Sequence, residues 1–207
     1  MSRPINARVG TYDRRVTESR DPRLINVLGA LALALADGIR DATEAAAGMT
    51  GAAPSALVAL HQFLAGRTTE DLAQATGLTH SGAVRLIDRL VDAGLVERRP
   101  GRDGRSLSIV LTAMGRALSR EVTVARATAI EAALDGLGSD DRRALLELVE
   151  TLIATVTAQR LGARENGGEP AGWLCRLCDF ASCGRPQGEC PAANAAQANP
   201  TGAPPTT

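Results

Sequence analysis

Residues 69–79 read TEDLAQATGLT, and this stretch decides the fold because it contains the end of one predicted helix and the start of the next. Residues 68–71 supply a capping residue and acidic side chains for a short helix over 71–76. Gly77 ends that helix, and Thr79 caps a second one that runs to about Ala93. A short turn of this kind sets the second helix across the first, which predicts a helix-turn-helix.

The second of these helices has one apolar and one polar face. Its apolar stripe is predicted to be buried and consists of Ala83, Leu86, Ile87, Leu90 and Val91. Side chains on the other face suit DNA, because arginine donates to guanine and to phosphate, serine bonds a base or a phosphate, and valine contacts a thymine methyl. The candidate DNA-binding residues here are therefore Thr79, His80, Ser81, Val84, Arg85 and Arg89.

A basic hairpin is predicted directly after the helix-turn-helix. Two β-prone runs, 95–99 and 106–111, flank the turn PGRDGR at 100–105. The hairpin carries Arg98, Arg99, Arg102 and Arg105 against Glu97 and Asp103, whereas the whole chain has a formal net charge of zero. An isolated charged hairpin is usually only solvated, but beside a helix-turn-helix a basic tip suits a narrow minor groove. The expected fold class is mainly α with a small β-hairpin wing.

Long amphipathic helices flank this unit, which is expected to form a DNA-binding lobe over 54–112. Apolar residues recur at three- and four-residue spacing in 21–48 and again in 113–162. These stripes are larger than a small lobe could cover, so both segments are expected to form dimerisation helices. Together, residues 21–162 make up the predicted winged helix domain.

The ends of the chain have a different composition. Residues 1–20 are expected to form a flexible arm, 163–172 a linker, and 192–207 a disordered tail, since the last segment lacks charge and large apolar side chains. The apolar run 24–36 follows several acidic residues and is judged too short to span a membrane. A soluble, cytoplasmic protein without a membrane partner is therefore expected.

All four cysteines fall within the predicted Cys-rich motif 173–191, at Cys175, Cys178, Cys183 and Cys190. In a reducing compartment, four thiolates in one short segment favour a metal site. Structural zinc would fold a segment that has little core of its own. An iron–sulfur cluster would make the protein a redox sensor, and a thiol switch is the third alternative. The spacing does not decide between zinc and iron–sulfur.

The run 69–118 resembles the DNA-binding half of the MarR family. The resemblance rests on TEDLAQATGLT, on LIDRLVDAGLVER at 86–98, on RDGR at 102–105 and on LTAMG at 111–115. It implies a homodimer that binds a palindromic site on double-stranded DNA. It also implies that Arg105 enters the minor groove while Asp103 holds this arginine in place, with Arg102 beside them.

The expected function is a sequence-specific DNA-binding transcriptional regulator, and repression is expected over activation. The regulator is expected to respond to a small-molecule effector or to the redox or metal state of the cysteines. No paired carboxylates, phosphate loop or nucleophile–histidine constellation points to an enzyme. The alternative is a metal-dependent or redox protein whose cysteines serve electron transfer or protein interaction.

Overall fold

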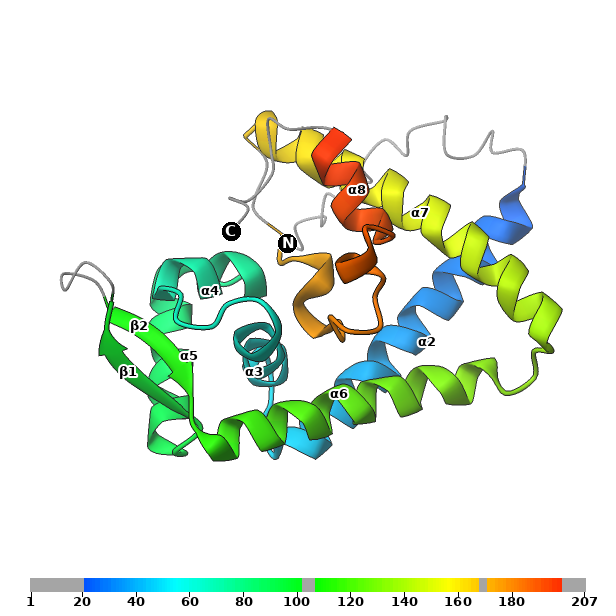
Figure 1. The fold of residues 1–207 in the computed structure, drawn as a ribbon. Helices are drawn as coiled ribbons and strands as arrows, with labels where there is room; N and C mark the ends of the chain where they lie inside the picture. The colour runs from blue at the N-terminus through cyan, green and yellow to red at the C-terminus, as the bar shows by residue number, and fades with distance from the viewer. Residues whose placement is uncertain (1–20, 102–106, 168–170, 199–207) are drawn as a thin grey trace, which may run out of the picture. The chain divides into compact units, whose positions relative to one another are not determined.

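The computed structural model describes residues 21–101, 107–167 and 171–198 (Figure 1). The chain divides into two compact units, 1–37 and 38–207, and each is described by itself. In the described residues, helices dominate and the sheet is a two-stranded antiparallel hairpin. The predicted class, mainly α with a small hairpin, is confirmed.

The helix-turn-helix consists of α4 (Thr69–Thr76) and α5 (His80–Asp92), and it packs on α3 (Ala53–Gln62). Helix α4 begins two residues earlier than predicted, because Thr68 and Asp71 cap it through a reciprocal pair of hydrogen bonds. Gly77 ends it with φ of 73°, which a residue with a Cβ rarely adopts. The Thr79 hydroxyl then accepts a hydrogen bond from the Gly82 N–H at 3.1 Å and caps α5, as predicted.

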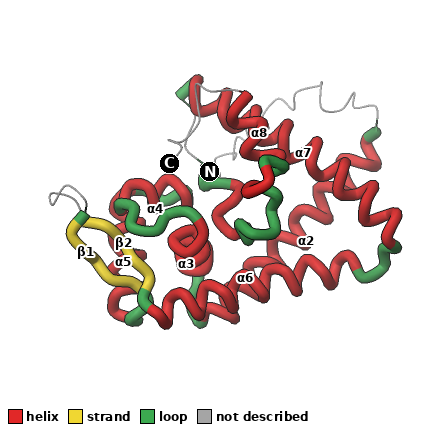
Figure 2. The backbone as a smooth tube through the Cα atoms, viewed as in Figure 1, coloured by secondary structure: helices red, strands yellow, loops and turns green. Residues whose placement is uncertain are grey.

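The hairpin pairs β1 (Val96–Pro100) with β2 (Leu107–Leu111), in a register that sets Arg98 opposite Ile109 (Figure 2, yellow). The connection between α3 and α4 bonds to the free edge of β2. The Gly66 N–H donates to the Ile109 carbonyl at 3.2 Å, and the Ile109 N–H donates to the Arg67 carbonyl at 2.9 Å. These bonds fix the hairpin to the helix-turn-helix, although its tip at 102–106 lies outside the described residues.

The core lies in this lobe, between α3, α4, α5 and the hairpin. Its largest side chains are at most 1% exposed: Leu57, Leu72, Ile87, Leu90 and Ile109. Burying one such side chain stabilises a fold by about 1.5–3 kcal/mol. The lobe therefore has a complete core within one chain.

The LTAMG segment joins the hairpin to α6 (Ala113–Leu134). The Thr112 hydroxyl accepts from the Gly115 N–H at 3.0 Å and donates to the Gly94 carbonyl at 2.8 Å, so it caps α6 and holds the start of β1. A Cβ on Gly115 would lie 2.0 Å from the Leu95 carbonyl oxygen. The glycine of this motif is thus required by the close approach of α6 to the hairpin.

The long helices α2 (Pro22–Ala47) and α7 (Ser139–Glu165) expose apolar side chains. Helix α7 extends three residues into the predicted linker. On α2 the exposed set is Leu24, Ile25, Val27, Leu28, Leu31 and Leu33, and on α7 it is Leu146, Leu148, Val149, Leu152 and Val156. These faces lack an apolar partner within the described parts of their own units.

Helix α2 corrects one expectation. Its 26 residues are long and apolar enough to cross a membrane by length and composition, so the argument that the apolar run is too short was wrong. The helix continues well beyond Ala36, because nothing in 37–47 breaks it before Gly48. Length and composition alone do not separate a bilayer span from a helix that packs against protein.

The C-terminal segment contains two short 3-10 helices, η1 (Leu174–Leu177) and η2 (Arg185–Gln187), followed by α8 (Pro191–Ala198), which packs along α7 (Figure 1). The predicted disordered tail was wrong for 192–198. Proline suits the first turn of a helix and alanine has the highest helix propensity, so the segment PAANAAQA is helical without large apolar side chains.

Candidate functional site

The predicted recognition face of α5 is open to solvent. Thr79, His80, Ser81, Arg85 and Arg89 are exposed, and Val84 is half-buried. The opposite face, with Ala83, Leu86, Ile87 and Leu90, is buried in the core as predicted, whereas Val91 is half-buried. The amphipathic pattern therefore orients α5 with its polar side chains pointing away from the lobe.

Two residues at the start of α5 have local partners. The Thr79 hydroxyl is occupied by the helix cap and also lies 3.3 Å from the Ser81 hydroxyl. The Nδ1 atom of His80 lies 3.2 Å from a Glu70 carboxylate oxygen on α4. Because this pair is well exposed, its contribution to stability is small.

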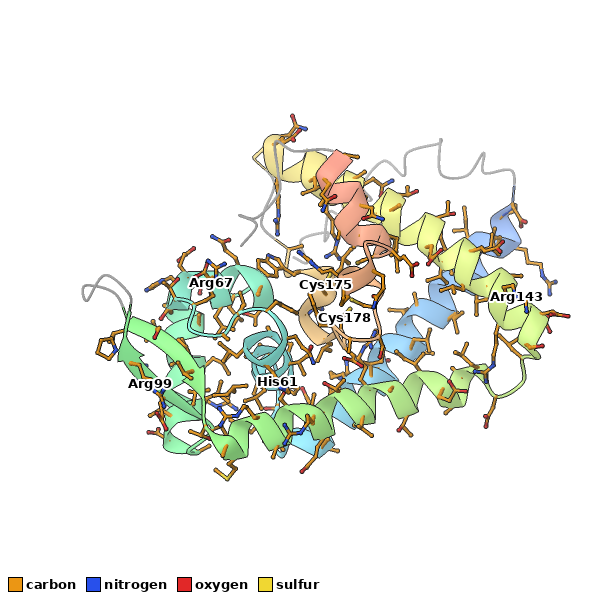
Figure 3. The ribbon with its side chains drawn as sticks, viewed as in Figure 1. His61, Arg67, Arg99, Arg143, Cys175 and Cys178 are labelled. Carbon is orange, nitrogen blue, oxygen red and sulfur yellow. The ribbon has the colours of Figure 1, made fainter. Side chains whose placement is uncertain are left out.

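The side chains of Arg85 and Arg89 form no hydrogen bond or ion pair with any described residue. Asp88, on the same face, is paired with Arg98 of β1 at 2.5 Å, so its negative charge is offset by the hairpin. Arg99 is paired with Glu97 at 3.0 Å (Figure 3). These ion pairs of Arg98 and Arg99 reduce the positive charge excess that was predicted for the hairpin. The guanidinium groups of Arg85 and Arg89 on α5 are not neutralised in this way.

The predicted wing residues Arg102, Asp103 and Arg105 lie outside the described residues. The strands on either side of them are described, with Pro100 of β1 paired to Leu107 of β2. The roles of these three residues stay predictions.

His61 of α3 makes a contact that sequence analysis did not predict. Its Nδ1 lies 3.0 Å from the hydroxyl of Ser119, which is fully buried on α6 (Figure 3). Burial lowers the pKa of His61, and the nearby Arg120 and Arg116 lower it further. The neutral imidazole therefore links α3 to α6.

The four cysteines come together around one pocket of about 420 Å³. All four thiols are free; Cys190 is buried, and the other three are half-buried. As they stand, however, no three His, Cys, Asp or Glu side chains in the described residues are placed to hold a single metal ion. Clustering of the thiols is therefore observed, and a metal ligand role stays a prediction.

The four thiols act on one another, because Cys178 and Cys190 each influence both Cys175 and Cys183. A hydrogen bond between Cys175 and Cys178 raises the pKa of Cys175 and lowers that of Cys178 to about 6, and Arg126 of α6 also lowers the latter. Burial raises the pKa of Cys183, which in turn interacts with Cys190. The Cys178 sulfur is thus the one most readily deprotonated in the Cys175–Cys178 pair.

The start of the predicted Cys-rich motif, with Gly172 at the end of the predicted linker, contacts the helix-turn-helix. The Trp173 ring stacks on Phe63 with centroids 5.7 Å apart, and the backbone N–H of Trp173 donates to the Ala75 carbonyl of α4 at 2.9 Å. Trp173 is the chain's one tryptophan and the first residue of the predicted Cys-rich motif, which was the available signal for such an anchor.

Residues 47–106 match the family model of the MarR family. Two solved proteins of Mycobacterium tuberculosis have the same fold. RV1404 is 28% identical, with a TM-score of 0.54 over 65% of this chain and 92% of that one. The MarR-family protein Rv2887, solved in complex with DNA, is 25% identical, with a TM-score of 0.51 over 62% of this chain and 96% of that one.

Reduced MarR of Escherichia coli shares the fold at 22% identity, with a TM-score of 0.52 over 60% of this chain and 95% of that chain. No curated protein matches the chain by sequence. The predicted resemblance to the MarR family and the winged helix fold are confirmed. The match covers 60 of the chain's 207 residues, and it supports the prediction of a transcriptional regulator.

Proposed function

We propose that this MarR-like transcriptional regulator binds a palindromic DNA site as a homodimer and reads it with the exposed face of α5. The observation that carries the proposal is the pair Arg85 and Arg89, which face solvent on a rigid, core-packed helix and have no partner among the described residues. A guanidinium group held in this way donates two parallel hydrogen bonds to guanine or to phosphate.

Local charge and the DNA-bound relative support this assignment. Since Arg98 neutralises Asp88, no unpaired carboxylate sits between Arg85 and Arg89 to repel phosphates. Rv2887, at 25% identity, was solved in complex with DNA, so a protein with this fold and a related sequence binds DNA. The hairpin follows α5 directly and would bring Arg102 and Arg105 to the adjacent minor groove.

A second copy of this chain is the proposed cover for the apolar faces of α2 and α7. Leu148 is 64% exposed and Leu31 49%, and each belongs to a continuous apolar stripe. Monomeric proteins rarely expose stripes of this size, and a palindromic site requires two recognition helices. A helix α2 that packs against a second protein chain does not span a membrane, which agrees with the proposed cytoplasmic location.

The test of DNA reading begins by selecting a binding duplex from random DNA with the full-length protein. Arg85→Ala should then bind that duplex about 5- to 150-fold more weakly, and should lose preference over an unrelated duplex. Arg143→Ala is the matched control, since Arg143 is an exposed arginine on α7, away from the helix-turn-helix (Figure 3). Equal losses in the two variants, or selection of no duplex by the wild type, would refute the proposal.

The dimer is tested by sedimentation of Leu148→Glu together with Leu152→Glu. These charges cannot be buried in an apolar interface, so the wild type should sediment as a dimer and the double variant as a monomer. The double variant Glu147→Gln, Glu150→Gln on the same helix is the control and should stay dimeric. A monomeric wild type would contradict the proposal.

Repression and control by a small-molecule effector stay predictions. A reporter gene downstream of the selected duplex shows the sign of regulation, because a repressor lowers expression and an Arg85→Ala variant restores it.

A further inference from the structure

The chain's four cysteines line one pocket that lies beside the helix-turn-helix. The pocket is about 420 Å³ in volume, and its wall also includes Trp173, Phe180, Arg160 and Arg185. Cys175 lies in η1 and Cys178 follows it directly (Figure 3). Cys183 and Cys190 lie on either side of η2, and Cys190 immediately precedes α8. A segment of 19 residues thus gathers every thiol of the protein around one space.

The segment around these thiols has little to hold it together on its own. Its regular structure is limited to 3-10 helices of four and three residues, and Gly184 and Gly188 both adopt left-handed backbone conformations. No disulfide links the thiols. Turn-rich segments with free, clustered cysteines are typically held by a thiolate-bound metal, whose binding supplies the folding free energy.

The charges near the thiols suit such a centre. Arg126 of α6 acts on Cys178, and Arg185 acts on Cys175. Four thiolates on a divalent ion, or on an iron–sulfur cluster, leave a net negative charge that these guanidinium groups offset. The four thiols line one pocket, although no three of them in the described residues are already placed around a single point.

The cysteine segment is anchored to the turn that sets the recognition helix. Besides the stacking of Trp173 on Phe63, the backbone of Gly172 lies against Gly77, so that a Cβ on Gly77 would be 2.7 Å from the Gly172 nitrogen. Gly77 is the residue at which the chain leaves α4 for α5. A shift of Gly172 and Trp173 would therefore remove direct support from this turn.

Further contacts tie the same segment to its surroundings. Arg160 and Arg164 of α7 donate to the carbonyls of Gly172 and Ala171, each at 3.0 Å. The Phe180 N–H donates to the side-chain oxygen of Gln62, at the end of α3, at 3.1 Å. The cysteine segment thus connects the lobe to the long C-terminal helix.

We propose that the four thiols hold a metal centre, either an iron–sulfur cluster or zinc, and that this centre controls DNA affinity through the contact of Gly172 and Trp173 with the α4–α5 turn. Removal of the centre releases Trp173 and weakens binding to the selected duplex. The control of affinity rests on the proposed function, whereas the metal site does not.

The first measurement is the metal and sulfide content, with the absorption spectrum, of full-length protein purified without oxygen. Iron with acid-labile sulfide and visible absorbance identifies a cluster, and a colourless protein with stoichiometric zinc identifies a zinc site. Either result supports a thiolate-bound centre. Protein that carries neither metal above trace, even after reconstitution with ferrous iron and sulfide or with zinc, overturns the proposal.

Variants then test the ligands. Cys178→Ser and Cys190→Ser should each lose the metal, whereas Ser182→Ala, next to Cys183, should keep it. Metal content unchanged in both cysteine variants overturns the assignment of these ligands. Should the cysteine variants fail to fold, the wild type still decides the matter: an iron–sulfur cluster, or cobalt(II) substituted for zinc, shows thiolate-to-metal charge transfer only if sulfur binds the metal.

Trp173→Ala tests the coupling, because it keeps all four thiols. We expect it to retain the metal and to bind the duplex at least about fivefold more weakly, the lower end of ordinary allosteric coupling. Chelation should weaken the wild type but change this variant little. Wild-type affinity that is the same with and without metal overturns the coupling.

Arg85→Ala separates the two hypotheses, since it should lose DNA binding and keep the metal. A wild type that binds metal but no duplex would refute the proposed function and leave the metal site standing.

Discussion

The lobe and the flanking helices use the same apolar residues in opposite ways. In the lobe, Ile87 and Leu90 are at most 1% exposed, whereas Leu148 and Leu152 of α7 are 64% and 47% exposed. Helices α5 and α7 both repeat leucine or isoleucine at three- and four-residue spacing. The difference shows that amphipathic periodicity indicates which face of a helix is apolar but not which molecule covers it.

The largest expected effect comes from truncating one side chain in each region. Ile87→Ala should lower the free energy of unfolding by about 2–5 kcal/mol, because it opens a cavity in a closed core. Leu148→Ala should act only through the dimer, so its effect should diminish as the protein is diluted. Urea unfolding at two protein concentrations measures both. A concentration-independent loss in Leu148→Ala would mean that α7 packs within its own chain.

A second pair of variants compares Gly115, where α6 closely approaches the hairpin, with Gly136, where an added Cβ has open space. Gly115→Ala should cost about 1–3 kcal/mol, because the added Cβ meets the Leu95 carbonyl. Gly136→Ala is the control, since a Cβ there meets nothing within 4 Å. Thermal unfolding of the two variants gives the comparison. Equal melting temperatures would show that α6 does not approach the hairpin this closely.

The smallest expected effect is a pH dependence confined to the lobe. Because burial lowers the pKa of His61, the unfolded chain binds this proton more tightly than the folded chain. His61 therefore contributes a loss of stability as the pH falls through the unfolded value of about 6.5. His61→Gln should lose less stability between neutral and mildly acidic pH than the wild type does, as measured by urea unfolding. The exposed His80→Gln serves as the control, and a matching change there would contradict the assignment to His61.

Much of the lobe could be predicted from local sequence. Thr68 and Asp71, Gly77, and Thr79 each carry their signal within four residues, since caps and left-handed glycines are local hydrogen-bond and steric effects. The exposed face of α5 could be predicted from the helical spacing of its apolar residues alone. Boundaries moved by a few residues where a cap lay earlier than assumed, as at Thr69.

The contacts that join distant parts of the chain could not be predicted in this way. Nothing near Trp173 in sequence indicates that it stacks on Phe63, or that Gly172 lies against Gly77. The ion pair of Arg98 with Asp88 likewise depends on how the hairpin folds back on α5. These pairings are nonlocal, and many residues of the same type satisfy the same local pattern.

By itself, the sequence determined the helix-turn-helix, the hairpin, the recognition face and the clustering of thiols along the chain, because each depends on neighbours within one or two helical turns. Only the tertiary structure decided that the cysteine segment packs on the α4–α5 turn, that helix α8 lies along α7, and that His61 joins Ser119. The physical reason is that packing free energy depends on which surfaces meet, and no local pattern specifies the partner.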